Sequence, residues 1–295
     1  MPGEEVNRQQ PARLSLINGR WANTISVLDR GLCFGDGLFE TMRFQAGRIA
    51  LWPLHKRRLL AGCARLRITL HEADLDAQLD TFLAAVNTRN LAENPGPDNF
   101  LAVKLMVTRG EGGQGYYPRK AGTSIIFTLR EMGAVKDDPI ELWPCDYRLE
   151  DNKTLAGIKH LSRLEYVLAG AEVDALAPKK GRCFEGLLFD QRGHCVETIH
   201  HNVLVVKQGE IMSPKLECCG VSGVMRTFIQ ETVLQKLGMT LSLADLTHDD
   251  LYLADEIILS NALRGVRSVT SYANREYVAG PITEKLRASI EHYWS

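Results

Sequence analysis

Strand-like segments surround two helix-like segments in the first half of this chain, instead of alternating with them one by one. Helical spacing is confined to residues 54–68 and 74–91. Strand patterns occur at 14–19, 37–52, 100–110 and 123–132, with a hairpin turn predicted at Ala46 and Gly47 and a loop at 94–99. Since a parallel βαβ fold requires strict alternation, this order predicts an α+β fold.

The composition turns polar at residues 133–139, where we place a linker between two domains. Beyond it, helices are predicted at 155–170 and 222–238, and strands at 140–149, 184–190, 195–209, 210–214 and 255–269. We therefore predict a flexible tail at 1–12, an N-terminal domain at 13–132, the linker at 133–139 and a C-terminal domain at 140–295.

The composition argues against several kinds of partner. The chain has 295 residues, a formal net charge of -1 and no lysine- and arginine-rich tract, so we expect no nucleic-acid partner. Its apolar runs are too short for a membrane span. Seven cysteines without a C-x-x-C pair, and no apolar signal segment, predict reduced thiols and a cytoplasmic protein. On a strand, adjacent His200 and His201 would point to opposite faces, and we predict no metal site.

Lys159 lies in LAGIKHLSRLEYVLAG, residues 155–170, beside apolar residues at three- and four-residue spacings. This spacing predicts a helix with one buried stripe and places Lys159 at its edge. Most lysines at such positions lay their stems along the surface and keep the ammonium group in water. The alternative is a partly desolvated amine with a lowered pKa, which can form a Schiff base with a carbonyl compound.

Glu197 alternates along a predicted strand with apolar Cys195 and Ile199, so its carboxylate is expected to face inward with them. A buried carboxylate without a partner costs several kcal/mol. A protonated pyridine nitrogen would be a suitable partner. The structural alternatives are an internal ion pair or an exposed acid on a strand.

Three further features could hold a phosphate group. The glycines of GVSGVMR, residues 220–226, precede a helix, whose first amides can bind an anion or form an ordinary junction. Ser260 and Asn261 follow a buried strand, where they could contact a ligand or close an Asx turn. Arg58, near the start of a helix, could pair with phosphate or remain solvated.

The sequence RGEGGQGYY, residues 109–117, is rich in glycine but does not match a nucleotide-binding loop. It lacks the G-K-[ST] ending, and no helix follows it directly. A flexible loop at the mouth of a pocket fits this composition better.

The order of these features resembles the fold type IV pyridoxal phosphate enzymes, the family of branched-chain and D-amino-acid aminotransferases and aminodeoxychorismate lyase. The shared series is H-x-x-R-L with Arg58, then Lys159, V-E-x-x-x-x-N with Glu197, SP, G-V-x-G-V-x-R and SNA. The resemblance runs from about Leu14 to the C-terminus and includes DRGLCFGDGLFETMR, residues 29–43. Within the family, LAGIKHLSRLEYVL is most similar to the aminodeoxychorismate lyases.

This resemblance implies a two-domain α+β fold, with a smaller α+β N-terminal domain and a larger, mostly antiparallel β C-terminal domain with helices. It implies pyridoxal 5'-phosphate bound to Lys159, with Glu197 at the pyridine nitrogen, and a homodimer with sites near the interface. The implied phosphate anchors are Arg58, the amides of Val224 and Met225, Ser260 and Asn261. The implied substrate contacts are Thr41, Arg43, Arg109, Gln114 and Tyr116. These lyases usually have arginine where this chain has Gln114, so we expect Arg43 or Arg109 to receive the substrate carboxylate.

The function that the resemblance implies is conversion of the small molecule 4-amino-4-deoxychorismate to 4-aminobenzoate and pyruvate, a step of folate biosynthesis. One alternative is an aminotransferase for D-amino or branched-chain amino acids, which needs a 2-oxo acid acceptor. Another is a cofactor-binding protein or structural paralogue without turnover, against which the presence of both Lys159 and Glu197 argues.

Overall fold

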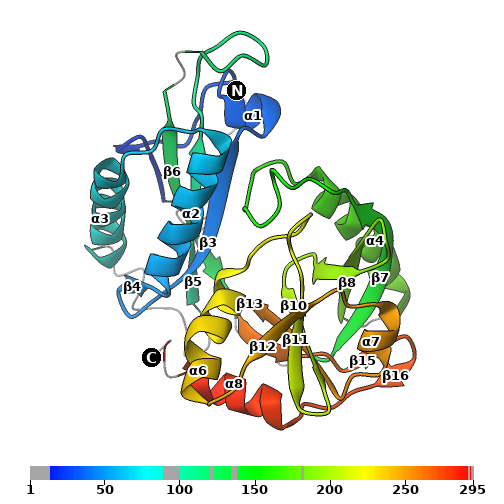
Figure 1. Ribbon diagram of the computed structural model, residues 1–295. Helices are drawn as coiled ribbons and strands as arrows, with labels where there is room; N and C mark the ends of the chain where they lie inside the picture. Colours follow the sequence, from blue (N-terminus) through cyan, green and yellow to red (C-terminus); the bar gives the residue numbers. More distant parts are fainter. Residues whose placement is uncertain are drawn as a thin grey trace, which may run out of the picture.

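The first half of the chain forms a six-stranded antiparallel sheet covered on one face by two helices (Figure 1). The computed structural model describes residues 14–88, 100–119, 122–133, 138–180, 183–291 and 293, so the expected tail at 1–12, the loop at 94–99 and most of the linker lie outside the described residues. The sheet order is β2-β1-β6-β5-β3-β4. Its strands are β1 (Ser15–Ile17), β2 (Arg20–Trp21), β3 (Gly37–Gln45), β4 (Arg48–Ile49), β5 (Phe100–Thr108) and β6 (Ser124–Met132).

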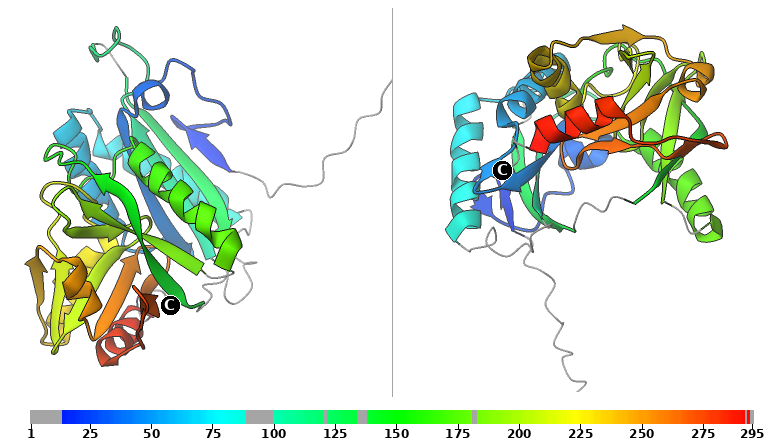
Figure 2. Two further views of the ribbon diagram at one scale, coloured as in Figure 1. Left: turned by 90° about the vertical axis from the view of Figure 1, so that its right-hand side faces the viewer. Right: turned by 90° about the horizontal axis from the view of Figure 1, so that it is seen from below.

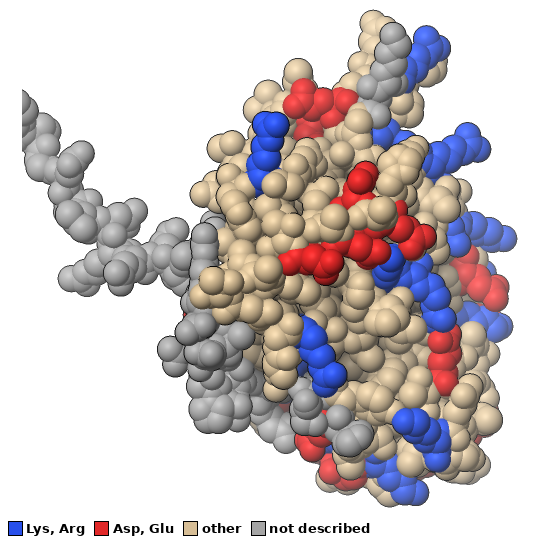
Figure 3. Space-filling view, turned by 90° about the vertical axis from the view of Figure 1, so that its left-hand side faces the viewer, with Lys and Arg blue, Asp and Glu red and all other residues tan. Residues whose placement is uncertain are grey.

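Three helices accompany this sheet: α1 (Arg30–Phe34), α2 (Trp52–Leu66) and α3 (Glu72–Thr88). Leu59 of α2 and Phe82 of α3 are buried in one core with the inward-facing residues of the sheet. Acidic and basic side chains lie close together on the face of the molecule that α3 occupies (Figure 3). Glu72 and Asp76 of α3 form ion pairs with Lys56 of α2. The predicted hairpin, helices and strands of this half are confirmed, with ends shifted by a few residues.

The second half contains two five-stranded sheets that share a core. One has the order β12-β11-β10-β13-β14 and the other β16-β15-β7-β8-β9, with more antiparallel than parallel pairs. Their strands are β7 (Ile140–Leu149), β8 (Cys183–Asp190), β9 (Cys195–Thr198), β10 (Asn202–Lys207), β11 (Glu210–Pro214), β12 (Leu241–Ala244), β13 (Glu256–Asn261), β14 (Gly265–Ser268), β15 (Ser271–Tyr272) and β16 (Arg275–Glu276).

Helices cover the outer faces of these sheets. They are α4 (Leu164–Lys180), α5 (Val224–Phe228), the π-helical turn Ile229–Val233, α6 (Leu234–Lys236), α7 (His248–Tyr252) and α8 (Pro281–Glu291). In β10, Val203 and Val205 face the core between the sheets, while Leu204 and Val206 face α5 and α8. Both faces of this strand are buried, which explains its unbroken apolar run. The helices α7 and α8 and the strands β12, β15 and β16 were not predicted.

The two halves lie side by side, with α2 facing α5 (Figures 1 and 2). The α+β fold expected from the sequence is confirmed. Its six-stranded sheet ends at Met132 and its other sheets begin at Ile140, while the division into domains at 133–139 stays a prediction. None of the helices in the described ranges is long and apolar enough to cross a membrane.

The predicted helix at 155–170 is wrong in its first half, because α4 begins only at Leu164. Gly157 has a φ of +79°, and its amide and carbonyl pair with Gly220 and Ser222 as a parallel bridge. The carbonyl of Lys159 accepts a hydrogen bond from the amide of Phe39 on β3, at 2.9 Å. These long-range backbone bonds use the groups that a helix would need, so Lys159 lies in an extended segment between the two halves.

The buried stripe expected on this helix is also absent from the structure. Leu164, Val167 and Leu168 of α4 are all exposed, by 45% or more. The core contacts of α4 come instead from Ala169 and Val173. The spacing of the apolar residues therefore marks an exposed apolar face of this helix.

Candidate active site

A cavity of about 430 Å³ lies between the two halves and gathers most of the predicted site residues. Its walls come from β3, α2, the segment before α4, the turn between β9 and β10, the start of α5 and the end of β13. Seven residues predicted from the sequence line it: Thr41, Arg58, Lys159, Glu197, Val224, Ser260 and Asn261.

Lys159 presents its amine to this cavity. Its Nζ lies 4.6 Å from the centroid of the Phe39 ring. Burial, together with the neighbouring cations Arg58 and Arg163, lowers the pKa of Lys159 from 10.5 to about 8, although nearby carboxylates oppose the shift. A larger fraction of this amine is thus neutral near pH 7 than for an ordinary lysine, which suits it to attack a carbonyl carbon.

Glu197 lies on β9 with its carboxylate inside the cavity, and only 4% of the residue is exposed. The hydroxyl of Tyr166 donates to its Oε1 at 2.5 Å, and Nδ2 of Asn202 donates to its Oε2 at 3.1 Å. Burial raises the pKa of Glu197, so its ionised form needs a cation nearby. The predicted inward orientation is observed, and a protonated ring nitrogen fits this environment.

Arg58 projects from α2 and is held by a buried carboxylate. Its Nε lies 2.8 Å from Oε1 of Glu40 and its Nη2 lies 2.5 Å from Oε2, while Nη1 donates to the carbonyl of Ser222 at 2.9 Å. Nδ1 of His55 lies 2.6 Å from the same carboxylate. Burial lowers the pKa of His55, so we assign it as neutral, with Nδ1–H donating to Glu40. This arrangement fixes the direction of the guanidinium of Arg58.

The start of α5 and the end of β13 offer unused hydrogen-bond donors near Arg58. The helix starting at Val224 has Gly223 as its N-cap, without a side-chain cap, and Met225 is the next residue. The hydroxyl of Ser260 is buried, and it has no hydrogen-bond partner among the described residues. A Cβ on Gly223 would come within 1.8 Å of Oδ1 of Asn202, so this residue has to be glycine. These groups fit a phosphate ester.

The side chain of Asn261 is already hydrogen-bonded within the chain, in the Asx turn that was one of the two alternatives predicted for it. Its Oδ1 accepts the amides of Leu263, at 3.1 Å, and Arg264, at 2.8 Å, in an Asx turn. Its Nδ2 donates to the carbonyl of His200 at 3.3 Å. Asn261 therefore shapes the cavity wall and ties it to the turn between β9 and β10.

Four predicted substrate contacts do not line the cavity: Arg43, Arg109, Gln114 and Tyr116. Arg43 lies over the Phe100 ring, with 4.3 Å to its centroid, and donates to the carbonyl of Leu263 at 3.0 Å. The backbone of Gln114 pairs with that of Tyr117, and Tyr116 is 86% exposed.

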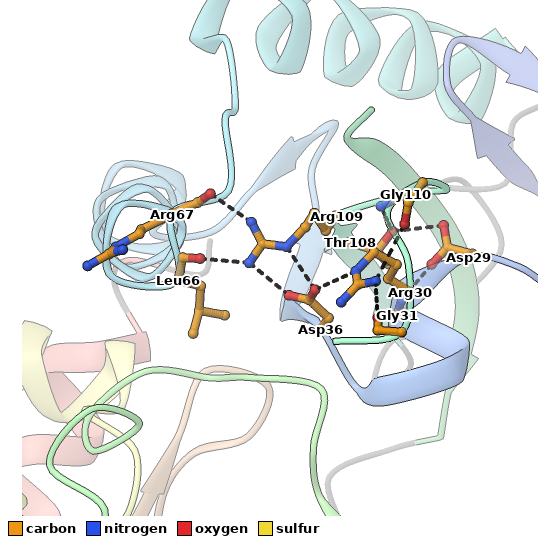
Figure 4. A network of polar contacts seen from close by, with 11 residues as sticks. Asp29, Arg30, Gly31, Asp36, Leu66, Arg67, Thr108, Arg109 and Gly110 are labelled. Carbon is orange, nitrogen blue, oxygen red and sulfur yellow. Dashed lines mark hydrogen bonds and ion pairs between the residues drawn. The ribbon is translucent and has the colours of Figure 1, made fainter. Parts of the chain in front are cut away.

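Arg109 forms a structural clamp (Figure 4). It pairs with the carboxylate of Asp36 at 2.8 and 3.0 Å and donates to the carbonyls of Leu66 and Arg67, both at 2.7 Å. Arg30 shares Asp36 and donates to the carbonyl of Gly115 at 2.8 Å, which anchors the glycine-rich loop. The guanidinium of Arg109 is thus committed to structure within this chain.

The structure adds cavity residues that the sequence reasoning did not assign: Phe39, Arg163, Tyr166, His200, His201 and Asn202. Asn202 was present in the V-E-x-x-x-x-N motif. The other five carry no local signal, because long-range pairing of β3, β9 and the segment before α4 places them.

Comparison with known proteins agrees with this geometry. The family model described as amino-transferase class IV matches residues 37–272. The aminodeoxychorismate lyase of Vibrio harveyi is 29% identical over 284 residues, covering 93% of this chain and 98% of the relative. The crystal structure of 4-amino-4-deoxychorismate lyase from Pseudomonas aeruginosa has a TM-score of 0.83 and 35% identity, covering 95% of this chain and 98% of that one. The branched-chain amino acid aminotransferase of Escherichia coli shares the fold, with a TM-score of 0.78, 20% identity, and coverage of 96% and 94%.

Proposed function

The chain belongs to the class IV aminotransferase family, and from this premise we propose that it is an aminodeoxychorismate lyase. The proposed reaction converts 4-amino-4-deoxychorismate to 4-aminobenzoate and pyruvate. The observation that carries this proposal is the 35% identity with the Pseudomonas aeruginosa lyase over 95% of the chain. Pyridoxal 5'-phosphate is the cofactor of this family and of this chain.

Each end of the cavity suits one part of this cofactor. Lys159 would hold its carbonyl carbon, Glu197 its pyridine nitrogen, and Arg58, the first amides of α5 and Ser260 its phosphate. When bound, the cofactor supplies a ring that accepts electrons from the carbon bearing the substrate amine. Glu197, kept inward by Tyr166 and Asn202, stabilises positive charge on that ring nitrogen.

Lys159 would serve as the proton carrier of the reaction. Its partly neutral amine accepts the proton from the amine-bearing ring carbon of the substrate. It returns a proton to the enolpyruvyl side chain, which leaves as pyruvate. The remaining ring becomes aromatic, so the atoms balance without water or an oxidant, and aromatisation supplies a driving force.

The test is pyruvate release from 4-amino-4-deoxychorismate by cofactor-loaded protein without any 2-oxo acid. Steady release, matched by 4-aminobenzoate and lost in Lys159→Ala, supports the lyase. If cofactor-loaded protein releases no pyruvate, the lyase proposal is wrong. The second candidate is then an aminotransferase, which the shared fold favours, to be screened with D-amino and branched-chain donors.

We also propose that the chain forms a homodimer. Exposed apolar side chains gather on α1, with Leu32 and Phe34, and on α4, with Leu164, Val167 and Leu168. Val167 also lines the cavity, so the apolar face of α4 continues to its mouth. Exposed apolar surface of this kind commonly marks an interface. Sedimentation of the holoenzyme as a monomer at micromolar concentration would contradict this proposal.

A further inference from the structure

The cavity must bind an anionic substrate, yet the arginines expected to receive its carboxylate are committed elsewhere. Arg43 and Arg109 do not line the cavity. The cavity cations Lys159 and Arg58 are assigned to the cofactor. Arg163 also lines it, and two of its three nitrogens, Nε and Nη2, already donate to the carbonyls of His160 and Ile158 at 2.9 and 3.1 Å.

His200 is the cavity residue that combines a cationic ring with access to a ligand. Its side chain is 70% exposed, while that of its partner Glu185 on β8 is only 12% exposed. The Nδ1 of His200 lies 3.3 Å from Oε2 of Glu185, and its backbone amide donates to Oε1 at 2.8 Å. Because Nδ1 faces Glu185, Nε2 is the ring nitrogen left for a ligand, and it carries a hydrogen to donate when the ring is protonated.

The charges around His200 favour its protonated form. The hydrogen bond with Glu185 raises the pKa of His200, while burial and the other charged groups facing it, Lys159 and Arg264, oppose this shift without cancelling it. Neighbouring His201 also pairs with Glu185, at 3.4 Å, and its side chain is only 6% exposed. Burial alone would raise the pKa of Glu185, but its contacts with both histidines hold it below its usual range. Glu185 therefore stays ionised and can support the cation.

We propose that His200, oriented by Glu185, receives one of the two carboxylates of the substrate. The identity of this carboxylate rests on the proposed lyase function, but a carboxylate site at His200 does not. Related lyases usually have an arginine at the position of Gln114, and His200 would take over its role of binding a carboxylate. His200 lies on the turn that follows Glu197. Its ligand class is an organic carboxylate bound beside the cofactor.

The test measures binding of chorismate to the holoenzyme by calorimetry between pH 6 and 8.5. Chorismate keeps both carboxylates but has a hydroxyl in place of the amine, so it cannot displace Lys159 from the cofactor. We expect His200→Gln to weaken binding about tenfold at pH 6 and to remove most of the loss of affinity that wild type shows as pH rises. His71→Gln, an exposed histidine outside the cavity, should match wild type.

Glu185→Gln provides an independent check, because it keeps the ring of His200 and removes its anionic partner. The pH at which affinity falls should move downward in this variant. Equal affinity and equal pH dependence in wild type and His200→Gln would overturn the proposal. If wild type fails to bind chorismate, the lyase proposal is decided by pyruvate release alone, and the same variants are tested with pyruvate. Affinity for pyruvate that depends on His200 would then support the carboxylate site, and its independence of His200 would refute it.

Discussion

The hydroxyl of Tyr166 lies 2.5 Å from Oε1 of Glu197, which joins the first turn of α4 to β9 inside the cavity. Burial, followed by the charge of Glu197, raises the pKa of Tyr166 well above its usual range, so the phenol stays protonated and donates. This bond lowers the pKa of Glu197 and opposes the effect of burial. We therefore propose that Tyr166 is a positioning residue for Glu197, the group proposed to face the cofactor nitrogen.

We expect Tyr166→Phe to weaken pyridoxal phosphate binding about tenfold, since a hydrogen bond to a buried carboxylate is lost. The pKa of Glu197 should rise, and the absorbance of bound cofactor should change with pH over a different range. Equilibrium titration of cofactor-free protein measures the affinity. Exposed Tyr117→Phe is the matched control. Unchanged affinity and an unchanged spectrum in Tyr166→Phe would show that the bond is dispensable.

The lowered pKa of Lys159 predicts the pH dependence of cofactor attachment. Only the neutral amine attacks a carbonyl, so the rate should rise with pH and level off above about pH 8, instead of rising toward 10.5. Borohydride reduction followed by peptide mass analysis measures the covalently held cofactor. Lys159→Ala should hold none. Lys104→Ala, whose lysine contacts the same Phe39 ring without lining the cavity, should behave as wild type. A rate that still rises beyond pH 9 would contradict this prediction.

Glu40 should couple stability to acid pH. Burial alone would raise its pKa, but Arg58 and His55 bring it from 4.5 to about 2. A group with a depressed folded-state pKa stabilises the protein above its unfolded pKa, and this contribution is lost as pH falls from 4.5 toward 2. The shift corresponds to about 3 kcal/mol of unfolding free energy. Urea unfolding of Glu40→Gln should show this loss at pH 7 and a flatter acid dependence.

The control for Glu40 is Glu72→Gln, which removes a surface partner of Lys56 with a side chain that is 60% exposed. It should cost less than about 1 kcal/mol, because exposed ion pairs are screened by water. Equal losses in the two variants would mean that the buried cluster around Arg58 is no stronger than a surface pair.

The role of Arg109 as a clamp predicts an effect on stability. Arg109→Gln should lower the free energy of unfolding by about 2 kcal/mol, since charged hydrogen bonds to Asp36 and to the end of α2 are lost. Affinity for chorismate should stay within twofold of wild type. Exposed Arg119→Gln should change neither quantity. Weaker ligand binding at unchanged stability would return Arg109 to the substrate-contact role expected from the sequence.

The inward position of Glu197 and the helix start at Val224 could be predicted because each lies in a local motif. Glu197 follows a tight turn on a short strand, and Val224 begins a helix after glycines, so nearby residues alone determine both positions. The setting of Lys159 could not be predicted, because the helical spacing around it competes with long-range backbone bonds. Lys159 bonds to Phe39, and Gly157 bonds to Gly220 and Ser222. The prediction that the apolar face of α4 is buried was wrong for a related reason. The spacing of apolar residues indicates which side of a helix is apolar, but it does not indicate whether another segment packs against that side.

Tyr166, Arg163 and His200 also line the cavity because of contacts between distant segments. The segment before α4 pairs with β3, and β9, which precedes His200, pairs with β8. Arg109 illustrates the reverse case. Its position beside a glycine-rich loop suggested ligand binding, yet the fold brings Asp36 and the end of α2 within hydrogen-bond distance. An arginine is identified as free or committed only when the partners from distant segments are known.

The bridge between Gly157 and Val221 connects the lysine segment to the turn before α5 through main-chain atoms alone, with amide-to-carbonyl distances of 2.9 and 3.0 Å. We expect this main-chain link to hold the spacing between Lys159 and the first amides of α5, the groups proposed to bind the two ends of the cofactor. Residues 198–201, on another wall of the cavity, take no part in that bridge. The turn proposed to receive substrate and the backbone link between the proposed cofactor groups are thus separate parts of the scaffold.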